Sequence, residues 1–231
     1  MKAMLLAAGR GERLRPLTDR TPKPLLEIGG RTLIEWQIGR LRRAGIRDFV
    51  INLAHLGAQI EAALGDGSRY GARFTYSREL EGALETGGGI RQALPFFEGE
   101  AFIVANADVW IEFDFARLPR LDGDLAHLLL VPNPVHHRAG DFALRAGRIV
   151  NDDAARYTFS GVAVYSPELF EPHAPGRFPL APLLRDAADR GLLGGEVFDG
   201  CWIDVGTPER LQEAQLRVAS LGEQKDCFNR L

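Results

Sequence analysis

Residues 1–7 form a short, continuous apolar run that stops at a segment rich in glycine and arginine. A run of this kind, without alternating polar side chains, is typical of a strand buried on both faces of a parallel sheet. Further apolar runs, at residues 49–54 and 101–105, alternate with helical patterns. This alternation predicts an α/β fold, in which a parallel sheet has helices on both sides.

The first helix has well-marked ends. Thr32 and Glu35 have the spacing of a capping box at its start, and Gly45 predicts its end. We expect a loop over residues 8–30, because this segment is rich in Gly, Arg and Pro and has little periodicity. Two further helices are expected at residues 56–64 and 90–94, the latter after a glycine run, and a strand at 72–76.

The second half of the chain has short apolar runs separated by turns, which predicts an antiparallel or mixed extension of the same sheet. The expected strands are residues 125–131, 142–144, 148–151 and 157–165, followed by a β-rich stretch at 194–205 and a closing helix at 208–221. No linker or internal repeat interrupts the sequence, so we expect residues 1–231 to form a single domain.

Charge and composition exclude several classes of protein. The formal net charge of −3 argues against general binding to nucleic acid or a membrane surface. No stretch approaches the ~20 apolar residues of a transmembrane helix, and residues 1–8 are too short for a signal peptide. Cys201 lies in an apolar segment and Cys227 in a polar one. A disulfide between them is not expected, which favours the cytoplasm.

The Gly-Arg segment after the first strand has the chemistry of an anion site. Gly9 and Gly11 allow the backbone to turn its amides toward a ligand, and Arg13 adds a permanent charge for phosphate oxygens. Ligands of open α/β sheets bind beyond the carboxyl ends of the strands, where this segment falls. The third glycine of a dinucleotide fingerprint and the Gly-Lys-Ser/Thr of a P-loop are missing. Taken alone, the segment could equally be a solvated surface loop.

Lys23 lies between Pro22 and Pro24, and Pro24 should hold it in an extended conformation. A rigid backbone that carries a flexible cationic side chain suits contact with a phosphate, although a Pro-Lys-Pro sequence alone is more often only a rigid turn. Residues 6–18 together with residues 22–25, at this spacing, resemble the signature of the sugar 1-phosphate nucleotidyltransferases. The resemblance implies a Rossmann-like, three-layer nucleotidyltransferase fold with a mixed, mainly parallel central sheet.

The resemblance also implies roles for single residues. Arg13 and Lys23 would be catalytic, and the nucleotide would be bound by Leu6, Ala7, Ala8, Gly9, Gly11, Arg13, Glu81, Gly87 and Gly88. For Gly87 and Gly88, close packing at a helix start is an alternative explanation. The weaker candidates for the sugar pocket are Asn106, Asp141, Thr158, Ser160 and Gly161.

Asp108 follows an apolar strand directly, and Asp204 stands between a short strand and the last helix. The resemblance implies that these two aspartates share Mg²⁺, which proteins often hold by one or two carboxylates together with phosphates. Each could instead be a structural residue, Asp108 in a turn and Asp204 near a helix start. Ala107 stands where the family often has glycine, which leaves the geometry of this loop less certain.

The expected partners are a nucleoside triphosphate, with UTP favoured, and a sugar 1-phosphate. Within the family, residues 85–89, 106–110 and 202–208 resemble members that act in cell-wall recycling, and this resemblance implies N-acetylmuramic acid 1-phosphate as acceptor. Glucose or mannose 1-phosphate and phosphocholine remain alternatives. A non-catalytic regulatory subunit that binds nucleotide sugars is a further one, although such subunits typically lose part of this residue set. An acceptor with a carboxylate requires a nearby cation, for which Arg31, Arg138 and Arg156 are candidates.

Overall fold

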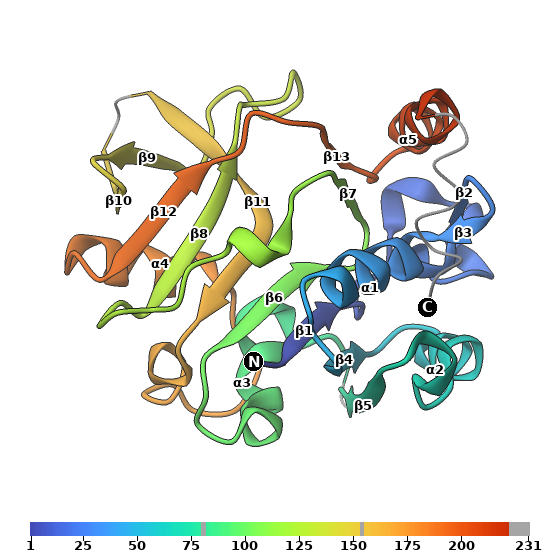
Figure 1. The fold of residues 1–231 in the computed structure, drawn as a ribbon, viewed down its shortest axis with the longest axis horizontal. Coiled ribbons are helices and arrows are strands. Elements are labelled where there is room, and N and C mark those ends of the chain that lie inside the picture. Colours follow the sequence, from blue (N-terminus) through green and yellow to red (C-terminus); the bar gives the residue numbers. More distant parts are fainter. Residues whose placement is uncertain (80–81, 153–154, 222–231) are drawn as a thin grey trace.

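The computed structural model describes residues 1–79, 82–152 and 155–221. Within this part of the chain, nine strands form one sheet in the order β5-β4-β1-β6-β11-β8-β12-β10-β9 (Figure 1). These strands are β1 (Ala3–Leu6), β4 (Asp48–Leu53), β5 (Arg73–Arg78), β6 (Phe102–Asn106), β8 (Ala126–Val131), β9 (Phe142–Arg145), β10 (Arg148–Val150), β11 (Arg156–Tyr165) and β12 (Leu193–Val197). Their pairings make every strand except β10 and β11 run in one direction. The predicted mixed, mainly parallel sheet is confirmed.

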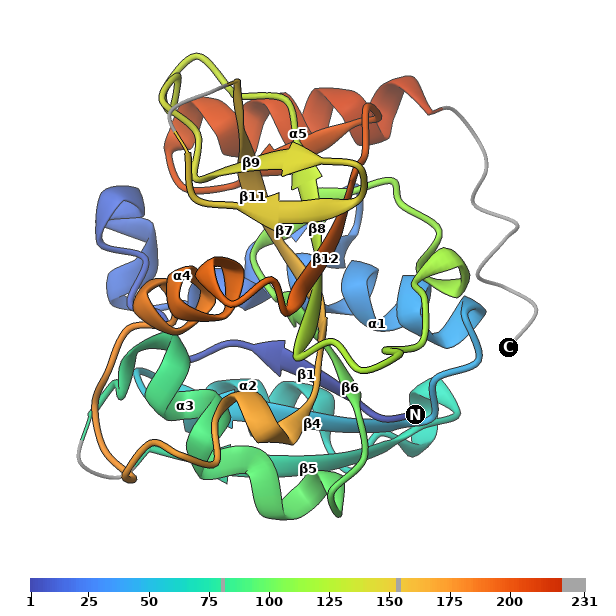
Figure 2. The same cartoon turned by 90° about the vertical axis from the view of Figure 1, so that its left-hand side faces the viewer.

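Helices cover both faces of the sheet, which gives the three predicted layers (Figure 2). They are α1 (Leu33–Arg43) and α2 (Gly57–Leu64) on one face and α3 (Glu85–Ala93) and α4 (Ala181–Asp189) on the other, whereas α5 (Pro208–Ser220) packs elsewhere. Alternate residues of β1 point to opposite faces. Leu5 therefore packs in the core with α1 and α2, whereas Met4 packs in the core with α3 and α4. The sequence analysis did not predict α4.

Two small ribbons lie beside the main sheet. β7 (Val109–Ile111) pairs with β13 (Trp202–Asp204), and β2 (Glu27–Ile28) pairs with β3 (Arg31–Thr32). α5 packs over both ribbons, and a third apolar core there includes Leu14, Trp110 and Ala214 (Figure 1). The β7–β13 ribbon carries residues from distant parts of the chain to the carboxyl end of β6.

The predicted capping box of α1 is present, with the Thr32 hydroxyl accepting from the Glu35 amide and the Glu35 carboxylate accepting from the Thr32 amide. The structure departs from the expected loop at residues 8–30, which forms short 3-10 turns and the β2–β3 ribbon. The 3-10 turns of the described chain are η1 (Glu12–Leu14), η2 (Leu17–Asp19), η3 (Lys23–Leu25), η4 (Ser68–Tyr70), η5 (Leu94–Phe97), η6 (Phe115–Arg117) and η7 (Pro167–Leu169).

The expected extended conformation of Lys23 is wrong, because Lys23 begins η3. In this turn the Leu25 amide donates to the Pro22 carbonyl, and the Leu26 amide donates to the Lys23 carbonyl. The first turn of a helix needs no amide donor at its second position, so Pro24 fits there. The preference of a residue before proline for extended backbone is thus overridden by these two hydrogen bonds.

The start of α3 differs from the prediction. α3 begins at Glu85, so the glycine run lies inside its first turns rather than before it. Glu81 and Cys227 lie outside the described residues. In the described part of the chain, no helix has the length and apolar character needed to cross a membrane.

Candidate active site

The loop that follows β1 is anchored by a buried polar network. The Ala7 amide donates to the side-chain carbonyl of Asn52 (2.7 Å), and the Asn52 amide group donates to Glu79 Oε1 (2.7 Å). Asn52 and Glu79 are both buried. Leu6, Ala7, Ala8 and Gly9 therefore leave the sheet in a fixed direction, as expected for residues that present their backbone to a ligand.

Gly11 is required by its surroundings. Its φ of +64° is in the left-handed region, and a Cβ at this position would lie 2.9 Å from Thr18 Cγ2 and 3.1 Å from Lys23 Cβ. The Leu14 amide donates to the Gly11 carbonyl and closes the first turn of η1. Amides that precede such a turn have no partner within it, so those of residues 9–13 can serve a ligand.

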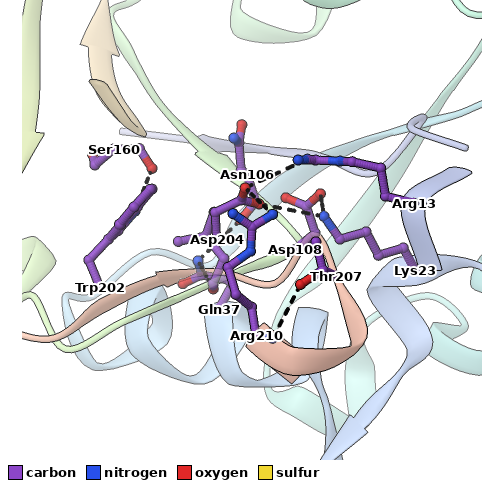
Figure 3. Close-up of polar contacts among 11 residues, drawn as sticks. Arg13, Lys23, Gln37, Asn106, Asp108, Ser160, Trp202, Asp204, Thr207 and Arg210 are labelled. Carbon is purple, nitrogen blue, oxygen red and sulfur yellow. Dashed lines mark hydrogen bonds and ion pairs between the residues drawn. The ribbon is translucent and has the colours of Figure 1, made fainter. Parts of the chain in front are cut away.

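Lys23 and the two predicted aspartates lie together (Figure 3). Lys23 Nζ is 2.5 Å from Asp108 Oδ2 and 3.7 Å from Asp204 Oδ1, and the Lys23 side chain is only 7% exposed. Arg13 Nη2 lies 3.7 Å from Asp204 Oδ2. Residues from four separate segments thus place two cations against two carboxylates at one point beyond the carboxyl ends of β1 and β6.

Backbone pairing holds the two aspartates in place. The Ala107 amide donates to the Leu6 carbonyl (3.1 Å), which ties the loop after β6 to the end of β1. The Val205 amide donates to the Asp108 carbonyl (3.2 Å), and Asp204 pairs with Val109 in the β7–β13 ribbon. The ribbon therefore sets the distance between residues that are almost a hundred positions apart.

Gln37 supports the same loop from α1. Its Nε2 donates to the carbonyls of Asn106 (3.1 Å) and Val109 (2.9 Å), which flank Asp108, and its side chain is fully buried. Sequence reasoning missed this residue. A signal existed, since Gln37 lies among Ile34, Ile38 and Leu41 on the apolar part of its helix, where a polar side chain needs a specific partner.

Arg210 is a further cation at the site that sequence reasoning missed. Its Nη2 lies 3.3 Å from Asp204 Oδ2 and is buried, but the angles do not form a hydrogen bond. A Cβ on Gly206 would lie 2.5 Å from Arg210 Nη2 and 2.7 Å from Arg13 Nη2. Glycine is thus needed for both guanidiniums to approach. Its position in the sequence was a possible indication of this role. Arg210 lies in the first turn of α5, where the helix dipole disfavours a positive charge unless a negative group is nearby.

His136, in the loop between β8 and β9, also belongs to this neighbourhood. Partial burial lowers its pKa, and the positive charges of Arg210 and Arg13 lower the pKa further, whereas Asp204 raises it. His136 therefore lies close enough to Asp204 and the two arginines for their charges to act on it. His137, the next residue, places Nε2 3.0 Å from Asp141 Oδ1 instead.

The two aspartates fit a magnesium site. Both carboxylates are partly exposed, at 28% for Asp108 and 24% for Asp204, and the ammonium of Lys23 lies where a cation contacts both. Within the described residues, no group of three or more His, Cys, Asp or Glu could hold a metal. A pair of hard oxygen ligands suits Mg²⁺, which commonly takes its remaining ligands from phosphates and water.

A cleft of about 460 Å³ opens next to this cluster. Of the residues predicted for the sugar, Asn106, Asp141 and Gly161 line it. Glu85 and Thr86 of α3 line another part, and most of the remaining lining is apolar, including Phe142 of β9 and Leu184 of α4. Asn106 belongs to both places, because it lines the cleft and precedes Asp108 by two residues. The cleft therefore adjoins the aspartates at Asn106, although neither aspartate lines it.

Thr158 and Ser160 do not reach the cleft. Both are buried, and their hydroxyls bond within the protein, Thr158 to Asn133 (2.9 Å) and Ser160 to the Val162 amide (3.1 Å). A bulge lies between Phe159 and Val162, where the register of β11 on β8 shifts. Successive side chains of a strand point to opposite faces, so Phe159 and Gly161 lie on the cleft wall, whereas Ser160 between them is turned away from it.

The predicted base contact by Gly87 and Gly88 stays a prediction. Both glycines are buried, and a Cβ would lie 2.6 Å from the Phe178 ring at Gly87 and 2.1 Å from the Gly176 carbonyl at Gly88. The Gly88 amide also donates to the Phe178 carbonyl (3.1 Å). Packing of α3 against residues 176–178 accounts for the glycine run.

A sheet covered by helices on both faces, with basic groups, loop amides and a carboxylate pair at its strand ends, has the groups that an enzyme acting on phosphate esters requires. The family model described as nucleotidyl transferase matches residues 2–137. The chain therefore belongs to the nucleotidyl transferase family, among the sugar 1-phosphate nucleotidyltransferases.

Individual relatives cover almost the whole chain. It is 50% identical to an N-acetylmuramate alpha-1-phosphate uridylyltransferase of Neisseria meningitidis serogroup B, over 93% of this chain and 97% of that protein. It is 34% identical to the enzyme of the same name from Caulobacter vibrioides, over 94% and 96%. A solved structure of a putative glucose-1-phosphate thymidylyltransferase from Bacillus anthracis has a TM-score of 0.84 at 24% identity, over 99% of both chains. That likeness shows the shared fold.

Proposed function

We propose that this chain joins N-acetylmuramic acid 1-phosphate to UTP, forming UDP-N-acetylmuramic acid and pyrophosphate. The observation that carries the choice of substrates is the 50% identity, over nearly the full length of both chains, to the Neisseria uridylyltransferase. The proposed pathway is cell-wall recycling, and the proposed compartment is the cytoplasm. The binding-only alternative is disfavoured because Arg13, Lys23, Asp108 and Asp204 are all present and converge.

In the proposed reaction a phosphate oxygen of the acceptor attacks the α-phosphorus of UTP. The bond from that phosphorus to the β-phosphate oxygen breaks, and pyrophosphate leaves. The attacking oxygen is already ionised near neutral pH, so neither a protein nucleophile nor a general base is required. The contribution of the chain is to position the reactants and to stabilise charge.

Each group of the cluster has a part in this proposal. The amides of residues 9–13 and the Arg13 guanidinium bind the triphosphate. Lys23 moves from the aspartates to the phosphates around the reacting centre, which is possible because its ammonium is a mobile point charge. Asp108 and Asp204 would hold Mg²⁺, which when bound neutralises negative charge on the phosphates.

The test measures pyrophosphate release by the purified protein with Mg²⁺. UTP, dTTP, GTP and CTP are each combined with the 1-phosphates of N-acetylmuramic acid, N-acetylglucosamine, glucose and mannose, and with phosphocholine. Omission of Mg²⁺ with added chelator should abolish release, since two aspartates facing bound phosphates need a cation between them. Selective release with UTP and N-acetylmuramic acid 1-phosphate is the expected result.

Other outcomes would change the proposal in defined ways. Release with a different pair keeps the reaction class and replaces the substrates. If no pair releases pyrophosphate while UDP-N-acetylmuramic acid binds, the regulatory-subunit alternative is favoured and the enzymatic proposal fails.

A further inference from the structure

Different elements form the walls of the cleft beside the aspartates. Asn106, two residues before Asp108, lines it on β6, and Ala181 and Leu184 line it on α4. An acceptor whose 1-phosphate lies at the aspartates must extend its sugar ring into this space. Substituents on the ring then point toward α4 and toward Phe142 on β9.

The basic side chains around the cleft differ in whether they already have an acidic partner. Arg177 donates from Nε to Glu85 Oε1 (2.9 Å), and Glu85 lines the cleft. His137 is likewise engaged by Asp141, another lining residue. These two basic groups already have acidic partners, so a bound anion would have to compete for them.

Arg185 differs from both. It belongs to α4, directly after the lining residue Leu184, and its guanidinium lies over the ring of Phe142, 5.5 Å from the centroid. Among the described residues the guanidinium has no carboxylate partner, and the backbone carbonyl of Arg185 accepts a hydrogen bond from the Asn151 side chain. A ring face holds a guanidinium in place without neutralising it, so the charge remains available.

We propose that Arg185 binds the carboxylate of the acceptor and thereby selects it. The inference rests on the proposed function, since N-acetylmuramic acid differs from N-acetylglucosamine only by a lactyl ether that ends in a carboxylate. The exposed side chain has the rotamer freedom to turn from Phe142 toward a ligand in the cleft. Two of the candidates from sequence are less well placed, because Arg31 lies on β3, which contributes no residue to the cleft wall, and Arg156 donates to the Asp152 carbonyl.

The test compares two products that differ only in this group, UDP-N-acetylmuramic acid and UDP-N-acetylglucosamine. Their Kd values are measured by titration calorimetry on wild type, Arg185→Met and Arg185→Lys. Loss of a charged hydrogen bond should weaken binding of the first product by about 10- to 100-fold in Arg185→Met, with less than a twofold change for the second. Arg185→Lys should retain part of the preference.

Two further variants serve as controls. Arg190→Met removes another exposed arginine at the end of the same helix and should leave both Kd values unchanged. Arg177→Met tests the rival cation at Glu85. Equal weakening of both products in Arg185→Met, no change in either, or loss of the preference in Arg177→Met instead would overturn the proposal.

Failure of the proposed function and failure of the proposed role of Arg185 give different experimental results. If wild type releases no pyrophosphate from UTP with N-acetylmuramic acid 1-phosphate, the proposed function fails and the role of Arg185 with it. If wild type is active and binds the carboxylate-bearing product more tightly, but Arg185→Met keeps that preference, only the role of Arg185 is wrong.

Discussion

Lys23 carries one positive charge between two carboxylates and is almost fully buried. Burial of a charge is costly unless it is paired, so this arrangement is stable only because both aspartates are present. The same burial makes the ammonium effective toward phosphates, because electrostatic interactions are stronger where water is excluded. In the proposed mechanism a single residue thus compensates the carboxylates before substrate binds and the phosphates afterwards.

Replacing Lys23 by alanine should lower kcat by at least ~10²-fold, the size expected when a group that stabilises transition-state charge is removed. Pyrophosphate release at saturating substrate measures this effect. The matched control is Lys2→Ala, because Lys2 also makes an ion pair, to Glu98, but at the opposite end of β1. An unchanged rate in Lys23→Ala would remove this residue from the mechanism.

At the scale of elements, the site depends on how α1 and the β7–β13 ribbon meet the end of β6. Gln37 fixes the carbonyls on either side of Asp108, and the ribbon fixes Asp204 opposite. At the other end of the ribbon, Arg217 of α5 binds Glu112 through two hydrogen bonds of 2.7 Å. Neither contact touches a substrate, yet both determine where the aspartates lie.

Gln37→Leu removes both donors to the loop while keeping the size of the side chain. Each carbonyl left without a donor costs about 1–3 kcal/mol, so the free energy of unfolding should fall. The Mg²⁺ concentration for half-maximal activity should rise several-fold, because Asp108 is less well held. Gln92→Leu is the matched control, since Gln92 Nε2 also donates twice, to Ser77 and Arg78, but on α3. An equal effect on the Mg²⁺ requirement in both variants would contradict the positioning role.

The Glu112–Arg217 pair should make stability depend on pH. Hydrogen bonds from Arg217 lower the pKa of Glu112 below its ordinary value of 4.5. A carboxylate with a lowered pKa in the folded state stabilises the protein above pH 4.5, and this contribution is lost as the pH falls through the lowered pKa. Arg217→Met should therefore reduce Tm at pH 7 by about 2–4 °C.

The difference in Tm between wild type and Arg217→Met should shrink as the pH is lowered below 4.5. Thermal melts followed by circular dichroism at several pH values measure it. Arg190→Met removes an exposed ion pair to Asp186 and provides the comparison. A Tm difference between wild type and Arg217→Met that stays constant down to pH 3 would show that ionisation of Glu112 is not the source of the stabilisation.

For the molecule as a whole, β6 and β11 join the two halves of the chain. Their antiparallel pairing runs from Ala105 opposite Val162 to Phe102 opposite Tyr165. The core on the α3–α4 side contains residues from both halves, and the far strands curl so that β9 pairs with the start of β11. This continuity supports our proposal that residues 1–231 act as one domain.

One domain should unfold in one step. Tryptophan fluorescence reports on Trp36, Trp110 and Trp202, which all lie around the β7–β13 ribbon, whereas far-ultraviolet circular dichroism reports on the whole chain. The two denaturation curves in urea should coincide, because loss of either half exposes the shared core. Separate midpoints would indicate two units that unfold independently.

The sequence by itself determined the features that depend on neighbouring residues. The apolar runs, the capping box at Thr32 and the Gly-Arg segment all follow from local pattern, and the residues after strands β1 and β6 must meet at one edge of a parallel sheet. The resemblance then singled out Lys23 and Asp204. Only the tertiary structure decided which side chains face the cleft, because it sets which face of β11 forms the cleft wall, and that face carries Gly161 and not Ser160. Arg210 and Gln37 became visible there too, since their roles are contacts between segments far apart in the chain.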